Sequence, residues 1–102
     1  MVSNEKFLKI RLDWGEYITY QIFDSQERGC VSVSNYKDET WIHCLYVDEK
    51  YRNNGIATRL LDMAENYAKH EIHVSTVENA PRWLIEFYKK RGYIVDNCDY
   101  LI

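Results

Sequence analysis

In the first half of the chain, β-branched, aromatic and other apolar residues gather in short runs that polar clusters separate. The runs lie at 7–12, 17–23, 30–33 and 40–47, and the last of them, TWIHCLYV, is the most apolar. The clusters between them, DWGE, DSQERG and NYKDE, are rich in turn-forming residues. Runs of this length predict four strands, and their short connections predict an antiparallel meander.

The second half of the chain changes period. Apolar residues recur at helical spacing over 56–68, and 71–77 alternates in the manner of a fifth strand. A second helix should follow, and then two closing strands at 93–95 and 99–102. The pattern therefore predicts one α+β domain over 1–102, with the element order ββββ-α-β-α-ββ.

The second helix has sequence signals at both of its ends. Asn79 is a favourable helix cap, and Pro81 is tolerated in a first turn. Gly92 suits a left-handed cap at the other end. Between these signals the apolar face of the helix would consist of Trp83, Leu84, Phe87 and Tyr88.

Length and composition indicate one folded domain. The 102 residues are 46% hydrophobic and 28% charged, which is enough for a single core and untypical of disorder. A net charge of −3 without a basic stripe argues against a nucleic-acid partner. The N-terminal residues lack the apolar stretch of a signal peptide, and no run approaches the length of a membrane span. We therefore expect a cytoplasmic protein without a membrane partner.

The three cysteines, Cys30, Cys44 and Cys98, are scattered and odd in number. No C-x-x-C pair occurs, so the sequence indicates neither a disulfide framework nor a metal site. Small buried apolar residues in a reducing compartment are the favoured interpretation.

One glycine stands where a strand should end and a helix begin. The stretch YRNNGIATRLL, at 51–61, contains Asn-Gly, which signals a hairpin when strands flank it on both sides. Here the downstream side has helical spacing, so the loop joins a strand to a helix. Such a loop presents backbone N–H groups at the positive end of a helix dipole, a site suited to phosphate. The glycine pattern fits neither a nucleotide P-loop nor a dinucleotide fingerprint.

A third phosphate-loop pattern does fit. The segment RNNGIA, at 52–57, resembles the Q/R-x-x-G-x-G/A motif of the GNAT N-acetyltransferases. Before it, LYVDEKY resembles the family's apolar strand end with an acidic residue and an aromatic. After it, Asn79 and YKKRGY, at 88–93, match the family's asparagine, helical tyrosine and Gly-aromatic pair in order. The resemblance extends from Trp41 to the C-terminus.

The resemblance implies a GNAT-type mixed, mostly antiparallel sheet whose central strand and next strand splay apart, with acetyl-CoA between them and no metal. Backbone N–H groups of 53–58 would receive the pyrophosphate, and a β-carbon at position 55 would obstruct its close approach. The central strand end would pair with pantetheine and polarise the thioester carbonyl. The implied cofactor-binding residues are Leu45, Tyr46, Val47, Arg52, Asn53, Asn54, Gly55, Ile56, Ala57, Thr58, Arg59 and Asn79. Arg59 is equally consistent with a solvated helix position, and Asn79 with a helix cap alone.

The chemistry implied by the resemblance is direct attack of a primary amine on the acetyl group. Tyr88 occupies the family's position for the acid that protonates the leaving thiolate, although a core aromatic is the alternative. The matching strands carry no glutamate to act as base. His43 is the candidate substitute because its ordinary pKa suits a base, although a structural role is more common for such a histidine. Glu39, Glu78 and His73 are weaker candidates.

One departure from the family concerns the acceptor side. The family usually inserts two helices between its first two strands, where this chain has only DWGE. We therefore expect an open acceptor side, suited to a protein lysine or N-terminus, or a homodimer that closes the site around a small amine. Two alternatives stay open, a non-catalytic acyl-CoA-binding module and a plain interaction domain, as does the preference for acetyl or a slightly longer acyl group.

Overall fold

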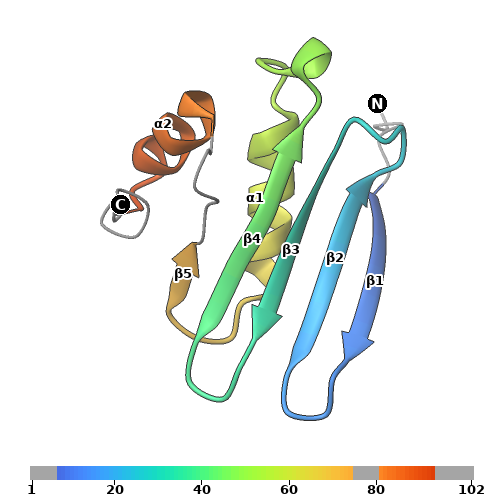
Figure 1. The fold of residues 1–102 in the computed structure, drawn as a ribbon, viewed down its shortest axis with the longest axis vertical. Coiled ribbons are helices and arrows are strands. Elements are labelled where there is room, and N and C mark those ends of the chain that lie inside the picture. Colours follow the sequence, from blue (N-terminus) through green and yellow to red (C-terminus); the bar gives the residue numbers. More distant parts are fainter. Residues whose placement is uncertain (1–6, 75–80, 94–102) are drawn as a thin grey trace.

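The four strands predicted for the first half of the chain form an antiparallel meander in the computed structural model, which describes residues 7–74 and 81–93 (Figure 1). Asp13 and Asp24 each end a strand and accept a hydrogen bond from the backbone N–H two residues on, which stabilises the turn that follows. The strands are β1 (Phe7–Asp13), β2 (Ile18–Asp24), β3 (Gly29–Asn35) and β4 (Thr40–Val47).

The second half adds helices and a parallel strand. Its elements are the short 3-10 helix η1 (Glu49–Tyr51), α1 (Ile56–Tyr67), β5 (Ile72–Val74) and α2 (Arg82–Lys90). Because β5 is parallel to β4, the five-stranded sheet is mixed, with the spatial order β1-β2-β3-β4-β5. The predicted α+β order is confirmed through the second helix. The predicted closing strands lie outside the described residues, apart from Tyr93.

Helix α1 covers one face of the sheet and lies behind β3 and β4 in Figure 1. Its buried side chains recur with helical spacing and meet the inward side chains of the strands in a single core. Asn35 fixes the end of the helix, because its side-chain N–H donates to the backbone oxygen of Tyr67 at 2.9 Å. The buried residues of α1 are Ile56, Leu60, Leu61 and Ala64.

The end of α2 lies where the sequence predicted it, but the start does not. Gly92 has φ 96°, and the N–H groups of Gly92 and Tyr93 close the helix in the hydrogen-bond pattern of a Schellman cap, as predicted. The start was predicted wrongly, because Pro81 occupies the N-cap position and the helix begins at Arg82. Proline before the first turn donates no hydrogen bond, so nothing is lost there. Asn79, the predicted cap, lies outside the described residues.

The face of the sheet opposite α1, called the outer face below, is turned toward the viewer in Figure 1. The connection between β1 and β2 has only four residues, 14–17, so the expected lack of helices at this point is confirmed. Leu8 and Trp14 are therefore 59% and 56% exposed. The homodimer that such a surface suggests stays a prediction.

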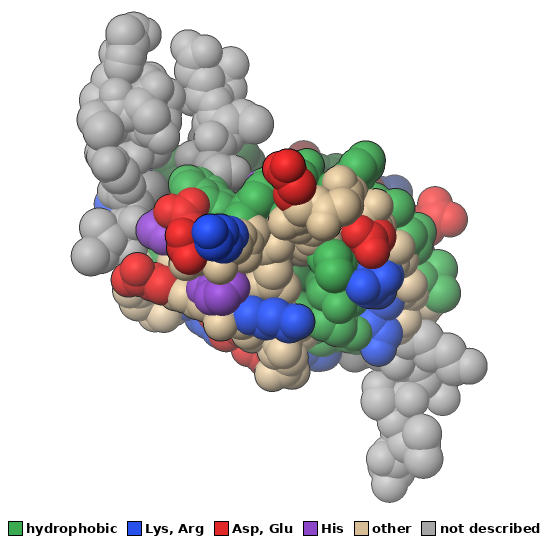
Figure 2. All heavy atoms as spheres, turned by 90° about the horizontal axis from the view of Figure 1, so that it is seen from below, with side chains coloured by type: hydrophobic (Ala, Val, Ile, Leu, Met, Phe, Trp, Pro, Cys, Tyr) green, Lys and Arg blue, Asp and Glu red, His purple; other side chains and the backbone are tan. Residues whose placement is uncertain are grey.

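Figure 2 looks along the strands at the end of the molecule where β2, β4 and β5 begin, and shows acidic, basic and histidine side chains close together.

Neither α1 nor α2, the α-helices of the described part, has the length and apolarity to cross a membrane.

Candidate functional site: the splay of β4 and the loop that follows it

The centre of the site is an irregularity in β4. Its register against β3 shifts at Cys44 and Leu45, which together lie opposite Val31 and so form a β-bulge. Cys44 adopts a left-handed φ of 61°, which is uncommon for a residue other than glycine. The bulge resets the alternation of the strand, so that Leu45 and Val47 both face the core.

Gly29 of β3 makes the upper part of this pairing possible. It lies opposite Val47, and a β-carbon at Gly29 would come within 2.6 Å of the backbone oxygen of Tyr46. Only glycine therefore allows β3 to approach the end of β4 so closely.

The splay expected from the family resemblance begins just below the bulge. Strand β5 pairs with β4 at three positions, the last of which joins Ile42 to Val74. Above Ile42, no described residue of β5 pairs with β4, and α2 lies to this side of it in Figure 1. Among the described residues, the edge of β4 from His43 to Val47 has no partner strand on the side of β5.

The loop after β4 turns the chain into α1. Asp48 caps η1 by accepting a hydrogen bond from the N–H of Lys50, and Asn53 and Gly55 then adopt left-handed φ angles of 66° and 82°. Gly55 is the N-cap of α1, and no side chain caps the first-turn N–H groups. These groups therefore remain directed at the space before the helix, as an anion site requires.

The structure gives a reason for Gly55 besides the predicted approach of a pyrophosphate, which stays a prediction. A β-carbon there would meet only the Arg59 guanidinium, at 3.4 Å, so space near the residue is not what excludes a side chain. The backbone decides, because φ 82° is strained for residues with a β-carbon.

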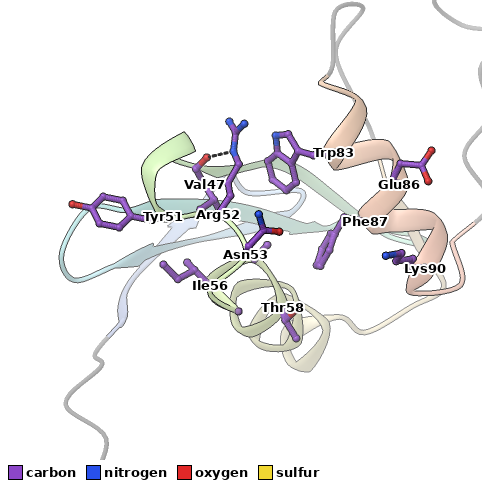
Figure 3. A pocket seen from close by; sticks show the side chains of 12 residues that line it. Val47, Tyr51, Arg52, Asn53, Ile56, Thr58, Trp83, Glu86, Phe87 and Lys90 are labelled. Atoms are coloured by element: carbon purple, nitrogen blue, oxygen red, sulfur yellow. Dashed lines mark hydrogen bonds between the residues drawn. The ribbon is translucent and has the colours of Figure 1, made fainter.

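A groove of about 370 Å³ lies between this loop and α2 (Figure 3). Figure 3 shows Trp83 and Phe87 reaching from α2 toward the loop, with Asn53 and Ile56 on the opposite side. The groove thus lies at the open edge of β4 and at the start of α1 together. Its lining residues are Val47, Tyr51, Arg52, Asn53, Gly55, Ile56, Ala57, Thr58, Trp83, Glu86, Phe87 and Lys90.

Arg52 connects the two walls of the groove. Its Nε donates to the backbone oxygen of Val47 at 2.9 Å, and its guanidinium lies 4.7 Å from the centre of the Trp83 ring. The cation–π contact holds a positive charge beside the groove. Arg52 therefore links the end of β4 to α2 and places a positive charge beside the groove.

The structure brings only part of the predicted cofactor set into this groove. Asn54 turns its amide to the backbone oxygens of Tyr51 and Arg52, which stabilises the loop. Arg59 turns back toward the backbone oxygen of Asn54. Neither residue lines the groove, and the side chains of Leu45 and Tyr46 also lie elsewhere. Their predicted contacts with a ligand stay predictions.

Tyr88, the predicted acid, is fully buried on α2. Its hydroxyl has no hydrogen-bond partner among the described residues. Burial, and to a smaller degree the neighbouring Cys44 thiol, raise the pKa of the Tyr88 phenol well above its ordinary value. The hydroxyl is therefore held protonated close to Cys44, and no described residue accepts or donates a hydrogen bond to it.

His43, the predicted base, lies on the outer face directly before the bulge. A chain of hydrogen bonds leads to it across three strands. The indole Nε1–H of Trp14 donates to Thr19 Oγ1 at 3.0 Å, Thr19 and Ser34 hydroxyls are 2.7 Å apart, and Ser34 Oγ is 3.2 Å from His43 Nε2. Burial lowers the pKa of His43 below its ordinary value, so the ring is neutral at pH 7.

The weaker base candidates lie below His43. Glu39 accepts a hydrogen bond from the indole N–H of Trp41, and His73 stacks on the same indole. Glu78 lies outside the described residues. His43 is therefore the candidate nearest the bulge along β4.

Several groove and network residues were not predicted. Trp83 and Phe87, predicted on the apolar face of α2, pack half-buried against the core and also line the groove, whereas Leu84 and Tyr88 are the buried side chains of α2. Their spacing with Lys90 along the helix is the signal that could have separated the two faces. Ser34, which was not singled out, is recognisable only once β2, β3 and β4 are aligned.

The family model for the acetyltransferase (GNAT) domain matches residues 14–95, most of the chain. The chain belongs to the GNAT family. No curated protein sequence matches it.

Solved structures of acetyltransferases share the fold. A GNAT acetyltransferase from Staphylococcus aureus is 18% identical with a TM-score of 0.62, over 85% of this chain and 59% of that one. An aminoglycoside acetyltransferase from an uncultured soil sample is 14% identical with a TM-score of 0.60, over 83% and 62%. Glucosamine-6-phosphate N-acetyltransferase from Arabidopsis thaliana is 13% identical with a TM-score of 0.58, over 82% and 65%.

The match therefore spans between 59% and 65% of the length of these three proteins. At such low identities the likeness concerns the fold. The activity of this GNAT chain has to be argued from its own residues.

Proposed function

We propose that this GNAT chain is an acetyl-CoA-dependent N-acetyltransferase that transfers the acetyl group to a primary amine by direct attack. The observation that carries the proposal is the buried Tyr88 hydroxyl beside the bulge, which has no hydrogen-bond partner among the described residues. Leaving such a group unpaired costs on the order of 1–3 kcal/mol. A ligand atom placed at the bulge would remove that cost.

The residues around the groove fit acetyl-CoA. The first-turn N–H groups of α1 suit the pyrophosphate, together with the positive charge of Arg52. The edge of β4 up to Val47, which no described residue of β5 pairs with, suits the amides of pantetheine, which would bind there as an added strand does. When bound, acetyl-CoA supplies an activated acetyl group as a thioester.

Three groups of this chain would then serve the transfer. A backbone N–H at the bulge would polarise the acetyl carbonyl, as in an oxyanion hole. His43 would accept the proton of the amine at Nδ1 while its Nε2–H donates to Ser34. Tyr88 would protonate the sulfur that leaves. Burial raises the pKa of the phenol, and it would raise the pKa of a thiol in the same site, so the two stay comparable.

The acceptor would approach from the outer face, where His43 lies. That face lacks the covering helices between β1 and β2, so it admits a protein lysine or an N-terminus as well as a small amine. The cytoplasmic location, the homodimer and the absence of nucleic-acid and membrane partners belong to the same proposal.

Thermal unfolding with coenzyme A and acetyl-CoA tests the binding step. A ligand of the folded state at a hundredfold excess over its Kd stabilises by about 2.7 kcal/mol, which raises the Tm of a domain of this size by roughly 10 °C or more. No shift with either compound would contradict both the enzyme and the acyl-CoA-binding module.

Release of free coenzyme A thiol with a panel of amines tests the chemical step. Tyr88→Phe should lower kcat by about a hundredfold, with the Kd for coenzyme A changed less than about twofold. Tyr67→Phe is the matched control, because Tyr67 stacks on Tyr20 away from the groove. Equal turnover of the Tyr88 variant and the control would remove Tyr88 from the reaction, and binding without turnover would leave the binding module.

A further inference from the structure

A shallow hollow of about 310 Å³ lies on the outer face below His43, apart from the cofactor groove. It is lined by Tyr36, Glu39, Trp41 and His43, at the end of the molecule seen in Figure 2. An aromatic surface with one carboxylate is a recognition pattern of its own, and neither the cofactor groove nor the proposed transfer step uses Glu39 or Trp41.

The carboxylate in this hollow is held in place. Trp41 Nε1–H donates to Glu39 Oε1 at 2.8 Å, and the Trp41 ring stacks on His73 with 5.0 Å between ring centres. The other oxygen, Oε2, is 3.9 Å from His73 Nε2, beyond hydrogen-bond distance. Glu39 is 49% exposed, so a ligand from solvent can reach this second oxygen.

The chemistry of the hollow selects a cation. An indole or phenol face attracts an ammonium group, and a fixed carboxylate adds an ion pair. At an exposed site the two contributions together amount to about a tenfold gain in affinity. A neutral or anionic ligand would gain neither.

Within the hollow, His43 lies at the end next to the bulge, and Glu39 and Trp41 lie at the end away from it. Trp41 precedes Cys44 by three residues, which corresponds to roughly 10 Å along a strand. His43 lies between them on the same face. A cation beside Glu39 and Trp41 would therefore belong to the far end of an acceptor whose reacting nitrogen is beside His43.

We propose that this hollow binds a second positively charged nitrogen of the acceptor, so that the preferred substrates are flexible aliphatic diamines or polyamines whose nitrogens can lie roughly 10 Å apart. The proposal rests on the N-acetyltransferase function above. It deepens that function by assigning the acceptor class and the residues that recognise it, Glu39 and Trp41.

The kinetic test compares linear diamines of increasing length with monoamines of the same chain length, by thiol release from acetyl-CoA. The wild-type kcat/KM should be about tenfold higher for a diamine that can span roughly 10 Å than for its monoamine. In Glu39→Gln this ratio should fall to below about twofold. Asp38→Asn, the same charge change at the exposed neighbouring residue, should keep the ratio.

A binding test without acetyl-CoA is independent of turnover. Titration with the diamine should move the Trp41 indole N–H signal in NMR spectra. The monoamine should need an about tenfold higher concentration to produce the same change in chemical shift. The Glu39→Gln variant should lose that difference.

The outcomes separate the two proposals. Turnover with equal rates for diamines and monoamines would overturn the second-nitrogen site and leave the acetyltransferase standing. Turnover only with lysine peptides, together with no response of the Trp41 signal to diamines, would indicate a polypeptide acceptor. That result would also overturn the second-nitrogen site. No turnover with any amine would contradict the N-acetyltransferase and, with it, the acceptor class.

Discussion

The two halves of β4 differ in what they offer to a ligand. Below the bulge, from Thr40 to Ile42, the strand is paired on both sides, and its outer face presents side chains that hold one another in place. Above the bulge, from Leu45 to Val47, no described residue of β5 pairs with it, and the end of the strand at Val47 lines the groove. The upper half therefore offers backbone groups and the lower half offers side chains.

This difference has a chemical consequence. Backbone N–H groups suit a ligand that is the same in every member of a family, because any sequence can supply them. Side chains suit the ligand that varies. The bulge at Cys44, where the two halves meet, is the natural place for the transferred group.

The largest expected effect is a loss of stability when the ion pair that holds the end of β4 above the bulge is broken. The buried Asp24 carboxylate binds Arg28 through Nε at 2.7 Å and Nη2 at 2.8 Å, and the backbone oxygen of Arg28 accepts from the N–H of Asp48. Asp24→Asn should lower the free energy of unfolding at pH 7 by about 3 kcal/mol, since it breaks a buried pair. Urea unfolding measures this, with exposed Asp38→Asn as control, and a loss no larger than the control's would contradict it.

The Asp24–Arg28 ion pair also predicts that the free energy of unfolding depends on pH. The hydrogen bond from Arg28 holds the pKa of Asp24 below its ordinary value. The unfolded state therefore takes up the proton first as pH falls, so this contribution is fully present above about pH 4 and is lost below it. Asp24→Asn should be less sensitive to acid than the wild type between about pH 5 and 2.

The next effect tests whether the lower half carries the base. His43→Gln should lower kcat/KM by about a hundredfold. Because burial lowers the pKa of His43, the wild-type rate should stay constant down to about pH 6.5 and fall only below it, as the ring takes a proton. An amine with a low pKa keeps the acceptor neutral throughout this profile. If the variant keeps the same acid limb, the base is another group.

A third effect concerns the loop of the upper half. Gly55→Val should weaken coenzyme A binding by about thirtyfold, because a β-branched residue is strained at φ 82° and the loop would change shape. Gly55→Asn should weaken it only severalfold, since asparagine tolerates the left-handed region. Calorimetric titration of both variants gives the comparison. Equal affinities for the two would mean that the backbone angle is not what binding needs.

The smallest effect tests the hydrogen-bond chain that holds His43. Ser34→Ala should lower kcat about fivefold and move the acid limb to lower pH, because the protonated ring loses the oxygen that accepts from Nε2–H. The Kd for coenzyme A should not change, since Ser34 is outside the groove. Ser34→Thr keeps the hydroxyl and should restore the profile, and failure to do so would indicate a packing effect.

Much of the fold could be predicted from the sequence because its signals are local. The four runs of the first half became β1 to β4, and the helical spacing after Gly55 became α1. The turn at Asn53 and Gly55 and the start of α1 were predictable for the same reason, since they lie within a few consecutive residues. The start of α2 was placed wrongly because Asn79 and Pro81 are both acceptable near a helix start, and local preference does not choose between them.

The sequence by itself thus determined the order of the elements from β1 to α2, the Gly55 turn and the family. Only the tertiary structure decided that Cys44 forms a bulge, that Gly29 admits it, and that Trp14, Thr19 and Ser34 lead to His43. The physical reason is that the sequence of a single strand does not show in which register it pairs with its neighbours. A bulge and a cross-strand network exist only after neighbouring strands have aligned, and the pairing that aligns them depends on residues far apart in the chain.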